Sequence, residues 1–169
     1  MDANAMASAP AAAVDPEALE KRLRSGASWF FWIAGLSLVN TVMAVTGSDQ
    51  AFLLGLAVTQ AADALATVWI QQGGPEAARW VAVGFDVVVV GLFVGAGLLA
   101  ARKKGWAFVL GIVLYVLDAA LCAVFEDWPT LGFHAFALIF LVMGYGALRK
   151  LRALEAPAAP APAANPLVR

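Results

Sequence analysis

Residues 79–125 read RWVAVGFDVVVVGLFVGAGLLAARKKGWAFVLGIVLYVLDAALCAVF, two apolar runs joined by a basic turn at 102–105. Each run has about twenty residues, the length that an α-helix needs to cross the ~30 Å hydrocarbon core of a bilayer. Each run also contains one aspartate, Asp86 in the first and Asp118 in the second. The stretch therefore predicts a transmembrane helical hairpin with an acidic side chain in each arm.

The composition of the whole chain is that of a membrane protein. Its 169 residues are 62% hydrophobic and only 14% charged, whereas about a quarter of the residues in a soluble domain are charged. The net charge of −1 gives no support to a nucleic-acid partner. One cysteine, Cys122, and one histidine, His134, exclude an internal disulfide and Cys- or His-rich metal motifs. We therefore expect the lipid bilayer as the main partner, and neither a metal nor another cofactor.

Apolar runs and the turn signals between them predict four transmembrane spans within one membrane domain, 16–152. The spans cover about 28–46, 80–101, 105–125 and 131–148. Asp15-Pro16-Glu17 predicts the start of a short charged helix that precedes the first span and lies at the membrane surface. The Ala-rich residues 1–15 and the Ala/Pro-rich residues 153–169 have little that could form a core, so we expect them to be disordered. No basic signal-peptide region is found at the start.

The segment 51–70 is apolar enough to be a fifth span, but its polar residues share one helical face. Those polar residues are Gln60, Asp63, Thr67 and Gln71. Four spans place the basic clusters at 21–24, 102–104 and 149–152 on one side, as the positive-inside rule requires, whereas five spans separate the first cluster from the others. We therefore expect an all-α up-down bundle of four spans, with 51–70 as an amphipathic or re-entrant helix between spans 1 and 2. Both termini are then cytoplasmic, in a bacterial-type inner membrane.

Polar side chains within the spans are the main functional signal. Each span has one such residue: Asn40, Asp86, Asp118 and His134. Counting 1.5 Å per residue from the outer end of each span places these residues about 5–11 Å from the outer edge of the bilayer. An aspartate in a span costs about 2.5–3.5 kcal/mol on insertion scales, so it normally faces the protein interior or a water-filled cavity. The pattern predicts a polar pocket open to the outer side. Tyr115 is included because it lies three residues before Asp118, on the same helical face. The candidate residues are Asn40, Asp63, Asp86, Tyr115, Asp118 and His134.

The same side chains also have a purely structural interpretation. Membrane helices use Asn, His and Asp as interhelical hydrogen-bond partners, at about 0.6 kcal/mol per contact. For Asn40 the structural interpretation is preferred, and for His134 the two are evenly balanced. Two aspartates within one hairpin, Asp86 and Asp118, favour a functional role, because ionisable groups inside a membrane usually mark a site.

Glycines form a second pattern in the second span. Gly84, Gly91 and Gly95 recur along one helical face, and the GxxxG pair Gly91/Gly95 permits close helix approach. At 100° per residue this face points nearly opposite to Asp86. Packing within the chain is the preferred interpretation, and a homodimer or a membrane-protein partner through Gly91/Gly95 is the alternative.

Motifs of nucleotide-binding proteins, hydrolases and metalloproteases are absent from the sequence. Three functional hypotheses follow. The preferred one is a non-enzymatic accessory or assembly protein, because no catalytic motif is found. The second is a binding or transport module for protons, a cation or a small polar ligand in the outer pocket. The third is an intramembrane acid–base enzyme on a lipid-derived substrate, with Asp86 or Asp118 as base and His134 as acid.

Overall fold

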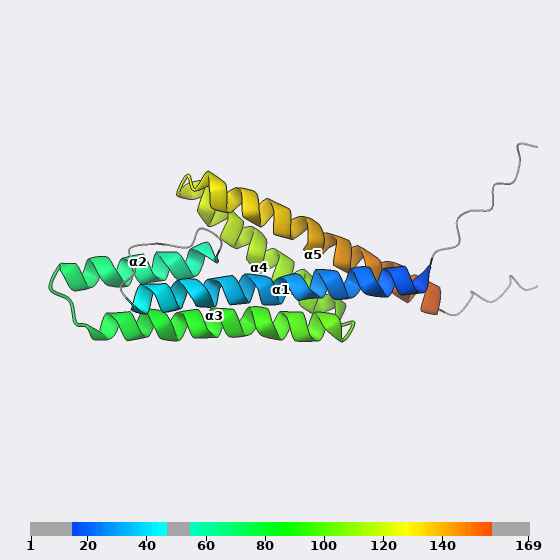
Figure 1. Cartoon of the computed structure of the whole chain (residues 1–169), viewed down its shortest axis with the longest axis horizontal. Coiled ribbons are helices and arrows are strands. Elements are labelled where there is room, and N and C mark those ends of the chain that lie inside the picture. The colour runs from blue at the N-terminus through cyan, green and yellow to red at the C-terminus, as the bar shows by residue number, and fades with distance from the viewer. Residues whose placement is uncertain (1–14, 47–54, 157–169) are drawn as a thin grey trace, which may run out of the picture.

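The computed structural model describes residues 15–46 and 55–156, and every regular element in those ranges is an α-helix (Figure 1). Four of these helices are long and apolar enough to cross a membrane, whereas the second in chain order, α2, is shorter. The protein is therefore an all-α integral membrane bundle with an extra helix after the first span, as predicted. The helices are α1 (Pro16–Val45), α2 (Ala57–Gln71), α3 (Ala77–Ala101), α4 (Gly105–Val124) and α5 (Trp128–Glu155).

Helix α1 confirms one prediction and corrects another. Asp15 caps the helix by accepting a hydrogen bond from the Glu17 backbone N–H at 2.9 Å, and Pro16 occupies its first turn, so the predicted start is correct. The predicted surface helix is wrong, because the helix continues without a break into the first span and is 30 residues long. It stays in the bundle because Leu19 and Leu23 are buried in the main apolar core instead of facing lipid headgroups.

The other helix limits differ modestly from those predicted. Helix α5 extends to Glu155, beyond the predicted end of the last span at 148, so part of the expected C-terminal tail is helical. The rest of both predicted tails lies outside the described residues. Both described ends of the chain lie at one end of the bundle (Figure 1). We call the opposite end, which carries the α2–α3 and α4–α5 turns, the distal end.

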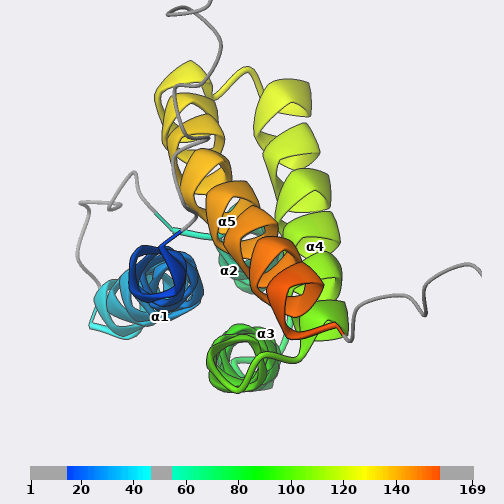
Figure 2. The same ribbon diagram turned by 90° about the vertical axis from the view of Figure 1, so that its right-hand side faces the viewer.

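The helices form two inclined pairs. Helices α1 and α3 pack along each other, and α2 lies beside α3, while the α4–α5 hairpin crosses at an angle (Figures 1 and 2). Helix α5 contacts α1 near the chain termini and diverges from it toward the distal end (Figure 1). Phe30 is at the centre of the core, with its ring 6.3 Å from Phe93 and 5.7 Å from Phe108. The divergence leaves space between α1, α2 and the α4–α5 turn.

Helix α2 is the extra helix between the first two spans. It begins inside the bundle, where Leu56 is completely buried, and runs along α3 to the distal end (Figure 1). Its apolar side chains Leu65 and Trp69 are 72% and 59% exposed, so they face outward, while Asp63 is turned toward the bundle. The predicted extra helix is therefore present and is not one of the candidate spans, and residues 51–54 of the predicted segment lie outside the described residues.

Close helix packing uses other glycines than those predicted. A Cβ atom built on Gly84, Gly91 or Gly95 would meet nothing within 4 Å, so the preferred interpretation, packing within the chain, is wrong for these three. The close approach instead occurs between α1 and α5, where a Cβ atom on Gly26 would lie 2.5 Å from the Gly144 Cα atom.

Candidate functional site

A buried histidine–aspartate pair joins α4 and α5. His134 Nε2 lies 2.8 Å from Asp118 Oδ2, and the two side chains are 0% and 4% exposed. His134 Nδ1 lies 2.8 Å from the carbonyl oxygen of Thr130, one turn earlier on α5. A carbonyl oxygen only accepts, so the contact with Thr130 is a hydrogen bond when Nδ1 carries the imidazole proton, and the contact with the Asp118 carboxylate is one when Nε2 carries it.

The same carboxyl group receives the N-terminus of α2. The backbone N–H groups of Ala57 and Val58 donate to the two Asp118 oxygens at 2.9 and 2.8 Å. The N–H group of Leu56 donates to Ser37 Oγ of α1 at 2.9 Å. Helix α2 has no side-chain cap of its own, so its unpaired first N–H groups depend on α1 and α4. A carboxylate also complements the positive end of the helix dipole.

Aromatic and thiol groups enclose the pair. The Tyr115 ring stacks on the His134 ring with centroids 4.4 Å apart and an angle of 18° between the planes. Cys122 Sγ lies 3.8 Å from His134 Nδ1, and both Tyr115 and Cys122 are buried. The buried Tyr115 hydroxyl has no hydrogen-bond partner in the part of the chain that the structure describes. We call Tyr115, Asp118, Cys122 and His134 the His134 cluster.

Asp86 belongs to a separate group between α1, α2 and α3. Its Oδ2 accepts a hydrogen bond from Thr41 Oγ1 of α1 at 2.8 Å, and the residue is 1% exposed. Burial raises the pKa of Asp63 on α2, and the Asp86 carboxyl group nearby works against that rise. The two hairpin aspartates therefore have different hydrogen-bond partners, Thr41 for Asp86, and His134 and the α2 backbone for Asp118.

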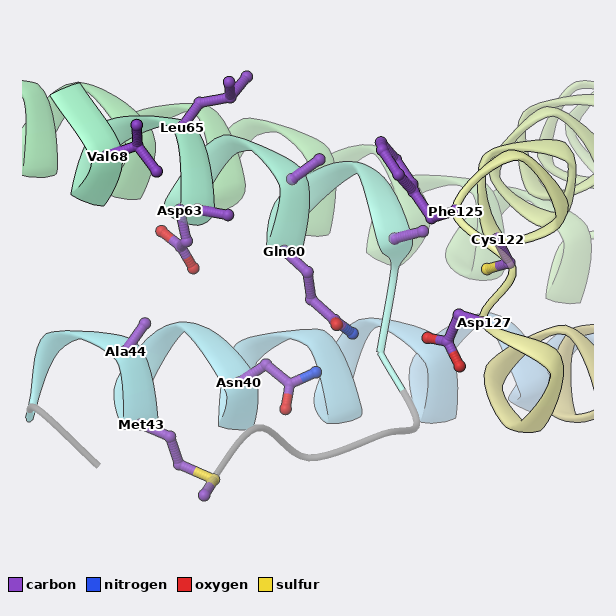
Figure 3. A pocket seen from close by; sticks show the side chains of 13 residues that line it. Asn40, Met43, Ala44, Gln60, Asp63, Leu65, Val68, Cys122, Phe125 and Asp127 are labelled. Atoms are coloured by element: carbon purple, nitrogen blue, oxygen red, sulfur yellow. The ribbon is translucent and has the colours of Figure 1, made fainter. Parts of the chain in front are cut away.

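A cavity of about 610 Å³ fills the space where the helices diverge at the distal end (Figure 3). Asn40 of α1 and Gln60 of α2 point toward each other across it (Figure 3). Both amide atoms of Asn40 and Nε2 of Gln60 are buried without a hydrogen-bond partner among the described residues. Buried polar atoms are usually paired, so the cavity offers unused hydrogen-bonding groups. Asp63 and Asp127 add two carboxyl groups to its lining.

A second cavity of about 500 Å³ lies on the other side of the α2 N-terminus, along α3 and α4. Asp118 is the polar residue in its otherwise apolar lining. Ala57 lines the first cavity, whereas Leu56 and Val58 line the second. The first turn of α2, held by Asp118, is thus the partition between the two cavities. We call them the distal cavity and the apolar groove.

The structure divides the predicted pocket into these parts. Tyr115, Asp118 and His134 form one cluster, Asp63 and Asp86 form another, and Asn40 lines the distal cavity with Asp63. The contributors that were not among the candidate pocket residues are Ser37, Thr41, Gln60, Cys122 and Asp127. Gln60 lies on the polar face of α2 together with Asp63, so the polar periodicity of 51–70 could have identified it as a pocket residue.

Within the described ranges, no group of three or more His, Cys, Asp and Glu residues could hold a metal ion. Comparison of the chain with protein-family models, with curated proteins and with solved structures found no match.

Proposed function

We propose that this membrane protein binds, without catalysis, a small molecule with an apolar body and a cationic or hydrogen-bonding head in the distal cavity. The observation that carries the proposal is the set of unpartnered amide atoms of Asn40 and Gln60 in that cavity. Its volume of about 610 Å³ is within the range of small-molecule sites, roughly 300–1,000 Å³. Such sites are mostly apolar with a few placed polar groups, which describes this lining.

The charges in the lining favour a cationic head. Asp63 and Asp127 are acidic, and the described residues of the lining include no lysine or arginine. An ammonium group donates hydrogen bonds and has no acceptor, so it matches the carboxyl groups and the amide oxygen of Asn40, whereas the amide nitrogens of Asn40 and Gln60 would pair with an acceptor atom elsewhere in the ligand. The apolar body of the ligand would contact Ala44, Ala61 and Phe125, which also line the cavity. A primary alkylamine is the simplest probe of this chemistry.

Binding can be measured in lipid nanodiscs with octylamine, octanol and octanoate, which share an apolar chain and differ in the head group. We expect saturable binding in the order octylamine, octanol, octanoate. Asp63→Asn is expected to weaken octylamine binding about tenfold, since a hydrogen bond to a charged group contributes about 1.5–3 kcal/mol. Isothermal titration calorimetry measures the affinities.

The matched control is Glu76→Gln, which removes an exposed carboxyl group outside the cavity. It should leave octylamine affinity unchanged. Equal affinities for the amine and the carboxylate, or equal loss in the two variants, would show that binding is mere partitioning into the bilayer.

A second candidate function, assembly with another membrane protein or a second copy, is favoured by the outward glycine face. Gly84 and Gly91 are exposed, and Cβ atoms built there or on Gly95 would meet nothing within 4 Å. Glycines let another helix approach closely when they line a lipid-facing surface. The neighbouring Val87, Val88 and Leu92 are 58%, 62% and 54% exposed, so the surrounding surface is apolar.

Gly91→Leu is expected to abolish such an association, because the larger side chain fills the groove. Light scattering of the purified protein measures the mass, and affinity capture from native membranes detects another partner. Gly35→Leu on α1 is the control, since a Cβ atom there also meets nothing within 4 Å. A monomer that captures nothing, or equal behaviour of the two variants, would refute the assembly role.

A further inference from the structure

We propose that the ligand of the distal cavity carries two cationic groups joined by a chain, with one group bound at Asp63 and the other at Asp127. The inference rests on the proposed function and names the class of molecule that the cavity takes. The observation that carries it is the placement of two carboxyl groups in one cavity, with unpaired amide groups between them (Figure 3).

The two acids lie at different levels along α2. Helix α2 begins beside α4, because Asp118 accepts the Ala57 N–H group at 2.9 Å. Asp127 stays near that level, since its backbone N–H donates at 2.9 Å to the carbonyl oxygen of Cys122, one turn after Asp118. Asp63 is six residues further along α2 than Ala57, which is about 9 Å at 1.5 Å per residue. A single ammonium group would therefore leave one of the two carboxyl groups without a partner.

Both carboxyl groups point into the cavity, Asp63 from α2 and Asp127 from the α4–α5 turn (Figure 3). One oxygen of Asp127 already accepts the Thr130 N–H group at 3.2 Å. A carboxylate has two oxygens and about four acceptor sites, so this bond leaves Asp127 able to bind a cationic group as well.

The protein supplies no counter-charge for either acid. Both side chains are half-buried, and none of the ion pairs among the described residues involves Asp63 or Asp127. Arg79 lines a small cavity of about 30 Å³ next to Asp63 but is exposed and forms no ion pair there. Partial burial of a charge without a partner is costly, so two cationic groups of a ligand complement this lining better than one.

The middle of the cavity fits the chain that joins the two groups. Asn40 is only 7% exposed, and neither of its amide atoms has a hydrogen-bond partner within the described residues. Gln60 faces it with an unpaired Nε2 atom (Figure 3). The other walls there, such as Ala44 and Ala61, are apolar. A mostly methylene chain fits between them, and the two amides can pair with a polar atom in that chain.

The test compares amines with one and two cationic groups. Isothermal titration calorimetry in lipid nanodiscs uses 1,4-diaminobutane, 1,6-diaminohexane and 1,8-diaminooctane, each paired with the monoamine of the same carbon number. We expect at least one diamine to bind about tenfold more tightly than its monoamine, the gain from a further hydrogen bond between charged groups. Partitioning into the bilayer acts in the opposite direction, because the second ammonium group makes the diamine less apolar.

Asp127→Asn is the decisive variant. Asparagine is as good a helix N-cap as aspartate, so the start of α5 is preserved while the charge is lost. The affinity ratio of diamine to monoamine should fall to near unity. Asp63→Asn should lower the ratio in the same way, since either change leaves one cationic group without a carboxylate. The matched control is Glu126→Gln, which removes an exposed carboxyl group next to Asp127 but outside the lining and should keep the parent ratio.

The outcomes separate this inference from the proposed function. If octylamine binds saturably but no diamine binds more tightly than its monoamine, the inference is overturned and the proposed function stands. A ratio that Asp127→Asn leaves unchanged, or that Glu126→Gln lowers equally, also overturns the inference. Absence of saturable binding by any of the amines refutes the proposed function itself.

Discussion

Asp118→Ala is expected to lower the free energy of unfolding by about 3–5 kcal/mol, because it removes the acceptor of several buried donors and each donor left unpaired costs about 1–3 kcal/mol. The substitution leaves His134 Nε2 and the N–H groups of Ala57 and Val58 without their acceptor. By comparison, an ordinary interhelical hydrogen bond in a membrane is worth about 0.6 kcal/mol. Reversible unfolding in mixed micelles with increasing SDS, followed by circular dichroism, measures the change.

Asp118→Asn is the control for this prediction. It keeps one acceptor oxygen for α2 and the shape of the side chain, so it should lose clearly less stability than Asp118→Ala. If Asp118→Ala costs less than about 1 kcal/mol, Asp118 is an ordinary interhelical contact, and the anchoring of α2 described above is wrong.

Gly26→Ala is the second substitution with a large expected effect, a loss of about 1–3 kcal/mol from overpacking. The added Cβ atom would lie 2.5 Å from the Gly144 Cα atom and 2.9 Å from the Phe140 carbonyl oxygen. Both neighbours are backbone atoms of α5, so relief requires the two helices to separate. That separation also disturbs Leu19 and Leu23, which are buried in the core nearby on α1.

Gly146→Ala is the matched control, two residues after Gly144 on the same helix. A Cβ atom there would meet nothing within 4 Å, so the substitution should be neutral or stabilising by up to about 1 kcal/mol, from helix propensity. The same SDS titration compares the two variants. Equal stabilities would mean that α1 and α5 are not in close contact at Gly26.

Much of the fold follows from one-dimensional features of the chain. The number of spans follows from the lengths of the apolar runs, and the start of α1 from the Asp15-Pro16 cap. The presence of an extra helix that is not among the candidate spans agrees with the polar periodicity of 51–70. The extension of α1 through Gly26 was not predicted, since it depends on a partner surface on α5 that no local pattern contains.

The candidate site was predictable only in part. Polar residues in apolar runs identify Asp86, Asp118 and His134, because the cost of burying them is a property of each residue and its depth. Their partners are a different matter. The bond from Thr41 to Asp86 spans 45 positions, and that from Ala57 to Asp118 spans 61. Such pairs depend on the rotation and tilt of each helix.

The sequence by itself thus determined that the chain is a four-span helical membrane protein with ionisable side chains in its interior, because hydrophobic length and burial cost act residue by residue. The tertiary structure alone decided that Asp118 binds both His134 and the N-terminus of α2, and that Asp86 binds Thr41. It also decided that Gly26, and not Gly91, is the site of close packing. The physical reason is that the inclination of the α4–α5 hairpin selects which helix faces meet and which remain apart.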